Sequence, residues 1–261
     1  MDAPKLLASL DQVDAVLNEY ETTCAAKLAP LGQGQDVRLD QAMREIESML
    51  ATATGSGSPE SALLGIQDTL RRLRAVPLRQ LVKDTSRALP SLAQELHKSV
   101  PTVEYEDRGT VIASDWVKAV QDVLVQSFRN ALAHGIEYPT DRIRSNKAPS
   151  GLLSVAAEQR EEGLRMSVWD DGRGLALDEL RSRTGLGDVP DDQVAEALFS
   201  AGVSTSSTVS EVAGRGVGMD LLRSAVRRLG GDVEIRFTGE SHDGYRPFAL
   251  VVSLPKHAVL A

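Results

Sequence analysis

Residues 128–137 read Phe-Arg-Asn-Ala-Leu-Ala-His-Gly-Ile-Glu, and they overlap the end of a helix predicted over about 114–133. Gln126, Asn130 and His134 are spaced by four residues, so a helix brings them onto one polar stripe. The opposite face is expected to pack on a sheet through Val117, Val120, Leu124 and Phe128. An amide oxygen such as that of Asn130 is a ligand that Mg²⁺ accepts beside phosphate oxygens. A helix with an ordinary solvated face is the alternative for this stretch alone.

A second motif, Val168-Trp-Asp-Asp-Gly-Arg-Gly174, follows a strand predicted over 164–169. The carboxylate of Asp170 precedes Gly172 and Gly174, and glycine lets the backbone bend tightly around a polar acceptor. Such an acceptor at the bottom of a pocket suits the exocyclic amine of adenine. Taken alone, the motif is equally typical of a simple Asp-Gly turn.

The third motif is Gly214-Arg-Gly-Val-Gly-Met219, at the start of a helix predicted over about 217–229. Glycines there let the backbone approach phosphates, which the N-terminus of a helix attracts. The motif lacks the third glycine of a dinucleotide-binding fingerprint and the lysine of a Walker A loop. A lone glycine-rich turn is weak evidence, so the three motifs are weighed together.

In this order, Asn130, Asp170-x-Gly-x-Gly174 and Gly214-x-Gly-x-Gly218 resemble the N, G1 and G2 boxes of the GHKL ATPase superfamily. That superfamily contains the histidine kinases, gyrase B, Hsp90 and MutL. The sequence is most similar to that of the CheA family of chemotaxis histidine kinases, over about residues 70–255. The order of predicted elements indicates an α/β protein with a two-layer α/β sandwich. The resemblance implies that this sandwich is of the GHKL (Bergerat) ATP-binding type.

The resemblance also implies roles for individual residues. Asn130 is expected to ligate Mg²⁺, His134 to approach the phosphates of ATP, and Asp170 to bind the adenine amine. The segment from Ser200 to Ala213 is expected to act as a lid over the nucleotide. The other residues that the resemblance places around ATP are Gly172, Gly174, Phe199, Ser204, Thr205, Gly214, Arg215, Gly216, Val217, Gly218 and Met219.

Gln126 departs from the family pattern, because CheA proteins carry a histidine there and other GHKL ATPases a glutamate. Glutamine accepts no proton at neutral pH, so we expect weak ATP hydrolysis. Transfer to a histidine needs less from the protein, because metal and positioning contribute most. The chain's own histidines are His97, His134, His242 and His257. None has the surroundings of a phosphorylation site, so we expect the acceptor histidine on a separate phosphotransfer domain.

Three helices are predicted before residue 76, at about 3–29, 37–53 and 60–74. We therefore expect an all-α helical dimerisation domain at 1–76, giving a homodimer, and an ATP-binding catalytic domain at 77–261. The second domain is predicted to contain helices at 78–99, 177–183 and 191–199, strands at 102–105 and near 111, a hairpin of 152–159 with 164–169, and final strands at 232–237 and 248–254.

Composition and charge limit the possible partners and the cellular compartment of the chain. The 261-residue chain has a formal net charge of −8, which argues against nucleic acid as a main partner. It has no apolar run that spans a bilayer and no signal peptide, so we expect a cytoplasmic protein. Its single cysteine, Cys24, excludes an intrachain disulfide and a cysteine-based metal cluster.

Our first hypothesis is a CheA-like histidine kinase core. It would bind Mg-ATP and pass the γ-phosphoryl group to a histidine on a separate histidine phosphotransfer domain. A response regulator would act downstream in the two-component pathway. A second hypothesis is a degenerate GHKL nucleotide sensor without transfer activity, which Gln126 favours. A third is a serine kinase of the anti-sigma type.

Overall fold

The computed structural model describes residues 41–49, 51, 59–200 and 218–260. The chain divides into two units, Met1–Leu73 and Arg74–Ala261, and each is described by itself. Among the helices that these residues form, none is long and apolar enough to cross a membrane.

In the first unit, residues 41–49 form a helix and α3 covers Pro59–Leu73, close to the predicted 60–74. The two helices approach at Gly65, where an added Cβ would lie 2.7 Å from Sδ of Met49. The helix predicted at 3–29 and the ends of the one at 37–53 lie outside the described residues. The dimerisation role of this unit therefore stays a prediction.

The second unit is built on a five-stranded sheet in the order β2-β4-β5-β9-β7. β2 is parallel to β4, and the remaining neighbours are antiparallel, so the sheet is mostly antiparallel. The hairpin and both final strands were predicted from the sequence and are confirmed. The strands are β2 (Thr102–Glu106), β4 (Leu152–Arg160), β5 (Gly163–Asp170), β7 (Asp232–Phe237) and β9 (Phe248–Pro255).

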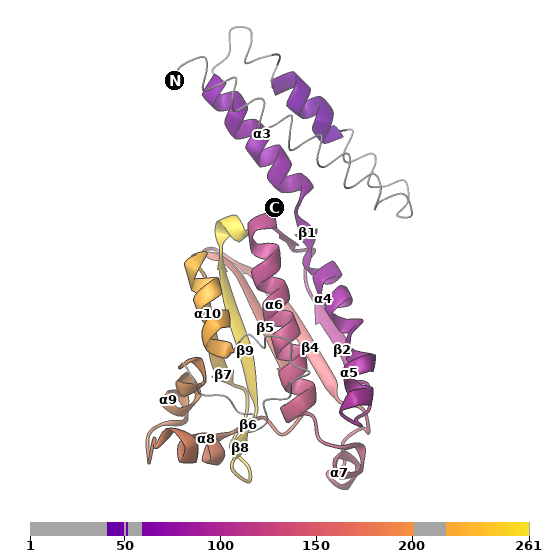
Figure 1. Cartoon of the computed structure of the whole chain (residues 1–261), viewed down its shortest axis with the longest axis vertical. Coiled ribbons are helices and arrows are strands. Elements are labelled where there is room, and N and C mark those ends of the chain that lie inside the picture. The colour runs from indigo at the N-terminus through magenta and orange to yellow at the C-terminus, as the bar shows by residue number, and fades with distance from the viewer. Residues whose placement is uncertain (1–40, 50, 52–58, 201–217, 261) are drawn as a thin grey trace. The chain divides into compact units, whose positions relative to one another are not determined.

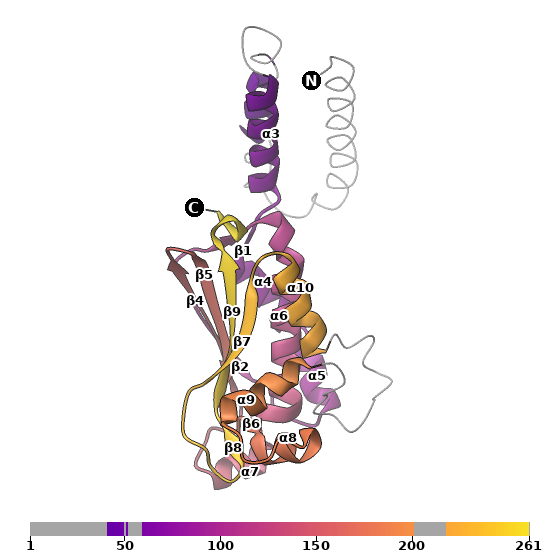
Figure 2. The same ribbon diagram turned by 90° about the vertical axis from the view of Figure 1, so that its left-hand side faces the viewer.

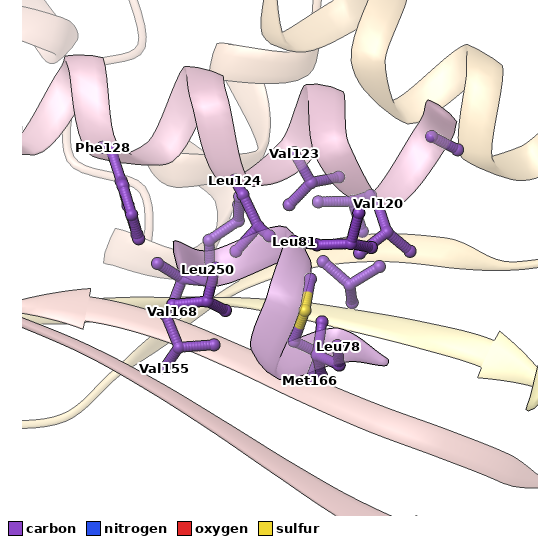
Figure 3. Packing of buried hydrophobic residues seen from close by; sticks show 14 of the residues in the cluster. Leu78, Leu81, Val120, Val123, Leu124, Phe128, Val155, Met166, Val168 and Leu250 are labelled. Carbon is purple, nitrogen blue, oxygen red and sulfur yellow. The ribbon is translucent and has the colours of Figure 1, made fainter. Parts of the chain in front are cut away.

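Three helices cover one face of this sheet, which makes the predicted two-layer α/β sandwich (Figures 1 and 2). They are α4 (Leu78–Ser86), α6 (Ser114–Asn130) and α10 (Met219–Arg228). The buried side of α6 points at alternate residues of the strands, such as Met166 and Val168 of β5 (Figure 3). This period-two match is why β5 buries Leu164, Met166 and Val168 on the helical side.

The predicted helix at 78–99 is wrong as a single element. It forms two helices, α4 and α5 (Leu89–Glu95), with a turn between them. Pro90 lies in the first turn of α5, and proline has no amide hydrogen to continue a helix that arrives from Ser86. The break places Lys98, beyond α5, where its ammonium group reaches the N-box segment, which is defined here as residues 128–137.

Short elements complete the unit. β1 (Val76–Pro77), β3 (Val111–Ile112) and β10 (Val259–Leu260) form a three-stranded sheet, and β6 (Leu175–Ala176) pairs with β8 (Tyr245–Arg246). The unit also contains α7 (Pro139–Arg144), α8 (Leu177–Thr184), α9 (Asp191–Glu196) and the 3₁₀ turns η2 (Ala197–Phe199) and η3 (Lys256–Ala258). β1, β6, β8, β10 and α7 were not predicted, because two to six residues carry too little periodicity.

Candidate nucleotide site

A cavity of about 230 Å³ opens where α6 ends and β5 ends. Its walls are mainly apolar, as is usual for small-molecule sites, with a few polar groups among them. The apolar wall includes Leu153, Val168, Leu175, Ile235, Phe248 and Leu250. The polar groups include Asn130, His134, Asp170, Arg173, Glu179 and Tyr245.

Asp170 ends β5 and lines this cavity. Burial raises the pKa of its carboxyl above the usual range, and the negative charges of Asp171 and Glu137 act in the same direction. The amide of Gly172 donates a hydrogen bond of 2.9 Å to Oδ1, which partly offsets the rise in pKa. A buried acceptor of this kind requires a hydrogen-bond donor, and the N–H of an amine can supply one.

The glycines around Asp170 are required by close packing. A Cβ at Gly172 would lie 2.3 Å from the backbone of Gly135, and a Cβ at Gly135 would lie 2.6 Å from Oδ1 of Asp170. Gly174 has φ of +89° and would carry a Cβ 2.3 Å from the carbonyl oxygen of Arg246. Any side chain at these positions would push the two motifs apart.

The helix α6 changes its winding where it reaches the cavity. Residues Ala131–Gly135 form a π-helical turn, η1, in which the amide of Ile136 bonds to the carbonyl of Ala131 at 2.7 Å. π turns are rare and are frequent at functional sites. This turn carries His134 to the cavity and sets Gly135 against Asp170.

Asn130 and Gln126 are joined by their side chains. The amide nitrogen of Gln126 donates a hydrogen bond of 3.0 Å to Oδ1 of Asn130, and Nδ2 of Asn130 lies 3.8 Å from Sδ of Met219. Asn130 and Met219 line the cavity, whereas Gln126 lies behind Asn130. Gln126 and Asn130 of the predicted stripe are therefore in contact, whereas His134, its third member, lies beyond α6 in the π-helical turn.

His134 lies at the opening of the cavity, among positive charges. Partial burial lowers the pKa of its imidazole, and the nearby charges of Lys98 and Arg173 lower it further. Lys98 donates hydrogen bonds to the carbonyls of Leu132 (2.8 Å) and Ile136 (2.6 Å), at the end of η1. Glu179, which also lines the cavity, acts on this pKa in the opposite direction, so the charged groups near the imidazole are Lys98, Arg173 and Glu179.

Four cavity or neighbouring residues were missed in the sequence: Lys98, Arg173, Glu179 and Tyr245. The Arg173 guanidinium lies 5.2 Å from the Tyr245 ring and donates to the carbonyl of His134 at 3.2 Å. Tyr245 comes from β8, which is held beside the G1 box by pairing with β6. Arg173 lies inside the quoted motif and was within reach of sequence reasoning, but the others depend on tertiary packing.

Several predicted residues cannot be placed. The positions that lie outside the described residues are Ser204, Thr205, Gly214, Arg215, Gly216 and Val217, with most of the predicted lid. Gly218 is the N-cap of α10. Phe199 packs beneath the Arg223 guanidinium at 4.4 Å and is not part of the described cavity wall. Nucleotide contacts by these residues stay predictions.

The donor set fits a metal that is bound jointly with a nucleotide. Within the described ranges no three His, Cys, Asp or Glu side chains gather around a possible metal site. Asn130 supplies one amide oxygen at the cavity, and Mg²⁺ commonly takes one or two protein ligands and completes its shell with phosphate and water. Asp170 supplies the buried acceptor that a base with an amine would require, so the described residues are compatible with a nucleotide and Mg²⁺.

Comparisons with known proteins agree with this geometry. Residues 119–257 match the family described as histidine kinase-, DNA gyrase B- and HSP90-like ATPases. The chemotaxis protein CheA of Halobacterium salinarum is 34% identical over 182 residues, 66% of this chain and 27% of that protein. CheA of Rhizobium meliloti is 28% identical over 241 residues, 89% of this chain and 30% of that protein.

The chain thus spans about a third or less of the length of these curated relatives. A solved structure of the mycobacterial sensor histidine kinase MprB is similar over 69% of this chain and 95% of that one, at 15% identity and a TM-score of 0.45. By its sheet, its cavity and its match over residues 119–257, the chain belongs to the histidine kinase-, DNA gyrase B- and HSP90-like ATPase family, and it is similar to CheA proteins.

Proposed function

We propose that this chain is the ATP-binding core of a CheA-like protein-histidine kinase. It binds ATP with Mg²⁺ and transfers the γ-phosphoryl group to a histidine on a separate phosphotransfer domain. The observation that carries the proposal is the Asp170 carboxylate in an apolar cavity, with Asn130 and His134 at the same cavity. Met219, at the start of α10, lines the same cavity.

Asp170 accepts the hydrogen bond of the adenine amine, and the apolar wall excludes water from the faces of the base. Asn130 contributes its Oδ1 to magnesium, which when bound would neutralise charge on the phosphates. His134 approaches the phosphates, and Lys98 and Arg173, the two cations that lower the pKa of its imidazole, add positive charge there. The positive field favours the polyanionic end of ATP there.

The transfer itself is an in-line displacement at the γ-phosphorus. A ring nitrogen of the acceptor histidine supplies the electron pair for the new N–P bond, and the bond from the γ-phosphorus to the β–γ bridging oxygen breaks. ADP leaves with that electron pair. Positioning and charge stabilisation contribute most of the catalysis in such a loose transition state. No general base from this chain is needed.

Gln126 fits this reaction better than it fits hydrolysis. Its amide holds Oδ1 of Asn130 by a 3.0 Å hydrogen bond, so we assign it an orienting role. A glutamine cannot take a proton from an attacking water at neutral pH. We therefore infer slow ATP hydrolysis but competent transfer to histidine.

The partners follow from the same proposal. The relatives are named chemotaxis proteins CheA, and we propose that this chain likewise acts in two-component signalling, in the cytoplasm, with a phosphotransfer domain as substrate and a response regulator downstream. We also propose a homodimer formed through residues 1–76. Light scattering at micromolar concentration tests this, and a monomer would contradict it.

Gln126 also supports a second candidate, an ATP sensor without transfer activity. Radiolabelled ATP separates the two when the chain is mixed with a histidine phosphotransfer domain. Acid-labile, base-stable label on that domain supports the kinase. No label with the natural chain, but label with Gln126→His, supports the sensor.

Binding is tested by isothermal titration with Mg-ADP. Asp170→Asn should weaken binding by about 100-fold, because the buried amide offers a donor to the adenine amine and a neutral acceptor in place of a charged one. Asp122→Asn is the matched control, since Asp122 lies on the outer side of α6 and pairs with Lys118. Wild-type affinity in the Asp170 variant would contradict the assignment.

A further inference from the structure

Two cations, Arg142 in α7 and Lys147 after it, connect the N-box segment to the turn at residues 170–172. Lys147 donates from Nζ to Oε1 of Glu137 at 2.8 Å and to the carbonyl oxygens of Asp171 at 2.8 Å and Gly172 at 3.2 Å. Arg142 bonds Oε2 of Glu137 at 2.9 Å and Oδ2 of Asp171 at 2.6 Å. Neither cation lines the cavity.

The turn that Lys147 holds is the turn that presents Asp170. Its two carbonyl acceptors belong to the peptide groups on either side of the Gly172 Cα, and the amide of Gly172 bonds Oδ1 of Asp170 at 2.9 Å. Glu137 lies two residues after Gly135, whose Cα faces the same carboxylate. One ammonium group therefore fixes both walls that define where the carboxylate lies.

We propose that Lys147 is a positioning residue for nucleotide binding, which holds the 170–172 turn against the N-box segment and so orients the Asp170 carboxylate toward the base. This inference rests on the proposed function. Lys147 does not touch the nucleotide; it acts through the backbone of Asp171 and Gly172. Arg142 anchors the other side of the same contact and is fully buried.

The charges around Asp170 give this role a signature in pH. Burial is the main reason for the raised pKa of Asp170; Asp171 and Glu137 raise it further, and Lys147 lowers it. Lys98, after α5, also faces this carboxylate, and His134 and Arg173 line the same cavity. The affinity for the adenine amine should fall as pH falls through the pKa of Asp170, because the ionised carboxyl is the stronger acceptor.

The experiment measures Mg-ADP affinity of the full chain by isothermal titration over a series of pH values. Lys147→Met should weaken binding by about tenfold and move the acid midpoint of binding to higher pH, because a positive charge near Asp170 is lost. Lys147→Arg should restore affinity to within about twofold, since it keeps the charge and the donors. Lys118→Met, at an exposed lysine on α6, should change nothing.

Glu137→Gln should shift the acid midpoint of binding in the opposite direction. It removes a negative charge that raises the pKa of Asp170, so the acid midpoint should move to lower pH. General loosening of the fold would move both variants in the same direction, which would overturn the proposal. So would a Lys147→Met variant with natural affinity and midpoint, or a Lys147→Arg variant as weak as Lys147→Met.

The titration separates the proposed nucleotide binding from the positioning role of Lys147. A natural chain that binds no ADP contradicts the proposed function, and the role of Lys147 falls with it. Natural binding of ADP that is indifferent to Lys147 contradicts only the positioning role. If Lys147→Met does not fold, the midpoint of Glu137→Gln and the affinity of Lys147→Arg decide the question.

Discussion

Two ion-pair networks of similar size differ in depth. The inner network consists of Glu137, Arg142, Lys147 and Asp171, and its Arg142 side chain is 0% exposed. The outer network, which links α10 to α9 and β7, consists of Glu196, Arg223, Arg227 and Asp232. Its Asp232 side chain is 48% exposed.

The difference teaches that position, rather than the number of pairs, sets what a network does. Water screens the Arg227–Asp232 pair of the outer network, so this pair can be exchanged at small cost. The inner network lies behind the cavity, where each charge depends on its partners and where the charges act on Asp170. It joins two sequence motifs that lie about 35 residues apart along the chain.

The strongest way to break the inner network is Arg142→Met. Both carboxylates would then lose a partner, and Glu137 is 18% exposed, so water solvates it poorly. Removing one partner of a buried pair costs about 3–5 kcal/mol. Urea unfolding of the second unit should report a loss in that range. A loss below about 1 kcal/mol would mean that the inner network behaves like the outer one.

The outer network should respond to Asp232→Asn with a smaller loss. Partial burial alone would raise the pKa of Asp232, but hydrogen bonds from Arg227, Arg223 and the amide of Val233 lower it from 3.8 to about 2. After allowing for solvent screening, we expect a loss of about 1 kcal/mol at neutral pH.

The pH dependence of this contribution has a definite sign. The pKa is lowered on folding, so the stabilisation is present above pH 3.8 and is lost as pH falls toward about 2. Unfolding curves of the natural chain and of Asp232→Asn should therefore converge in that window. Curves that stay parallel down to acid pH would show that the carboxylate contributes nothing through its charge.

The smallest effect is expected at the Lys118–Asp122 pair on the outer side of α6, where the side chains are 79% and 36% exposed. Asp122→Asn should cost no more than about 0.3–0.5 kcal/mol, as for other pairs four residues apart on a helix. High salt should remove even this difference, while the loss from Arg142→Met should remain. A large effect at Asp122 would undo the distinction between exposed and buried pairs.

Much of the architecture was predictable because the long elements carry clear patterns. The hairpin of β4 and β5, strands β7 and β9, and helix α6 each follow a period of two or of about four residues. Asp170, Asn130 and His134 were predictable from their motifs and line one cavity. The split of 78–99 into α4 and α5 was missed, although Pro90 signals it.

Lys98, Lys147 and Tyr245 could not be assigned from sequence, for a common physical reason. Each acts through tertiary contacts with groups that have no sequence signal, such as the carbonyl of Ile136 or that of Gly172. Lys98 was given no role from the sequence, yet its ammonium group bonds three carbonyls at the end of η1. Burial of backbone acceptors is decided by the fold, not by spacing.

The π turn at Ala131–Gly135 limits how the length of this segment can vary. A ring closed from residue i to i+5 holds one residue more than an α-helical ring, so the turn is an α-helix with one extra residue. Losing one residue here would restore regular winding and bring Ile136, with its side chain, to the place of Gly135. That place admits no Cβ, since one would lie 2.6 Å from the Asp170 carboxylate. A gap-free count from Asn130 to Gly135 is therefore a stricter criterion for an intact site than the identity of the residues between them.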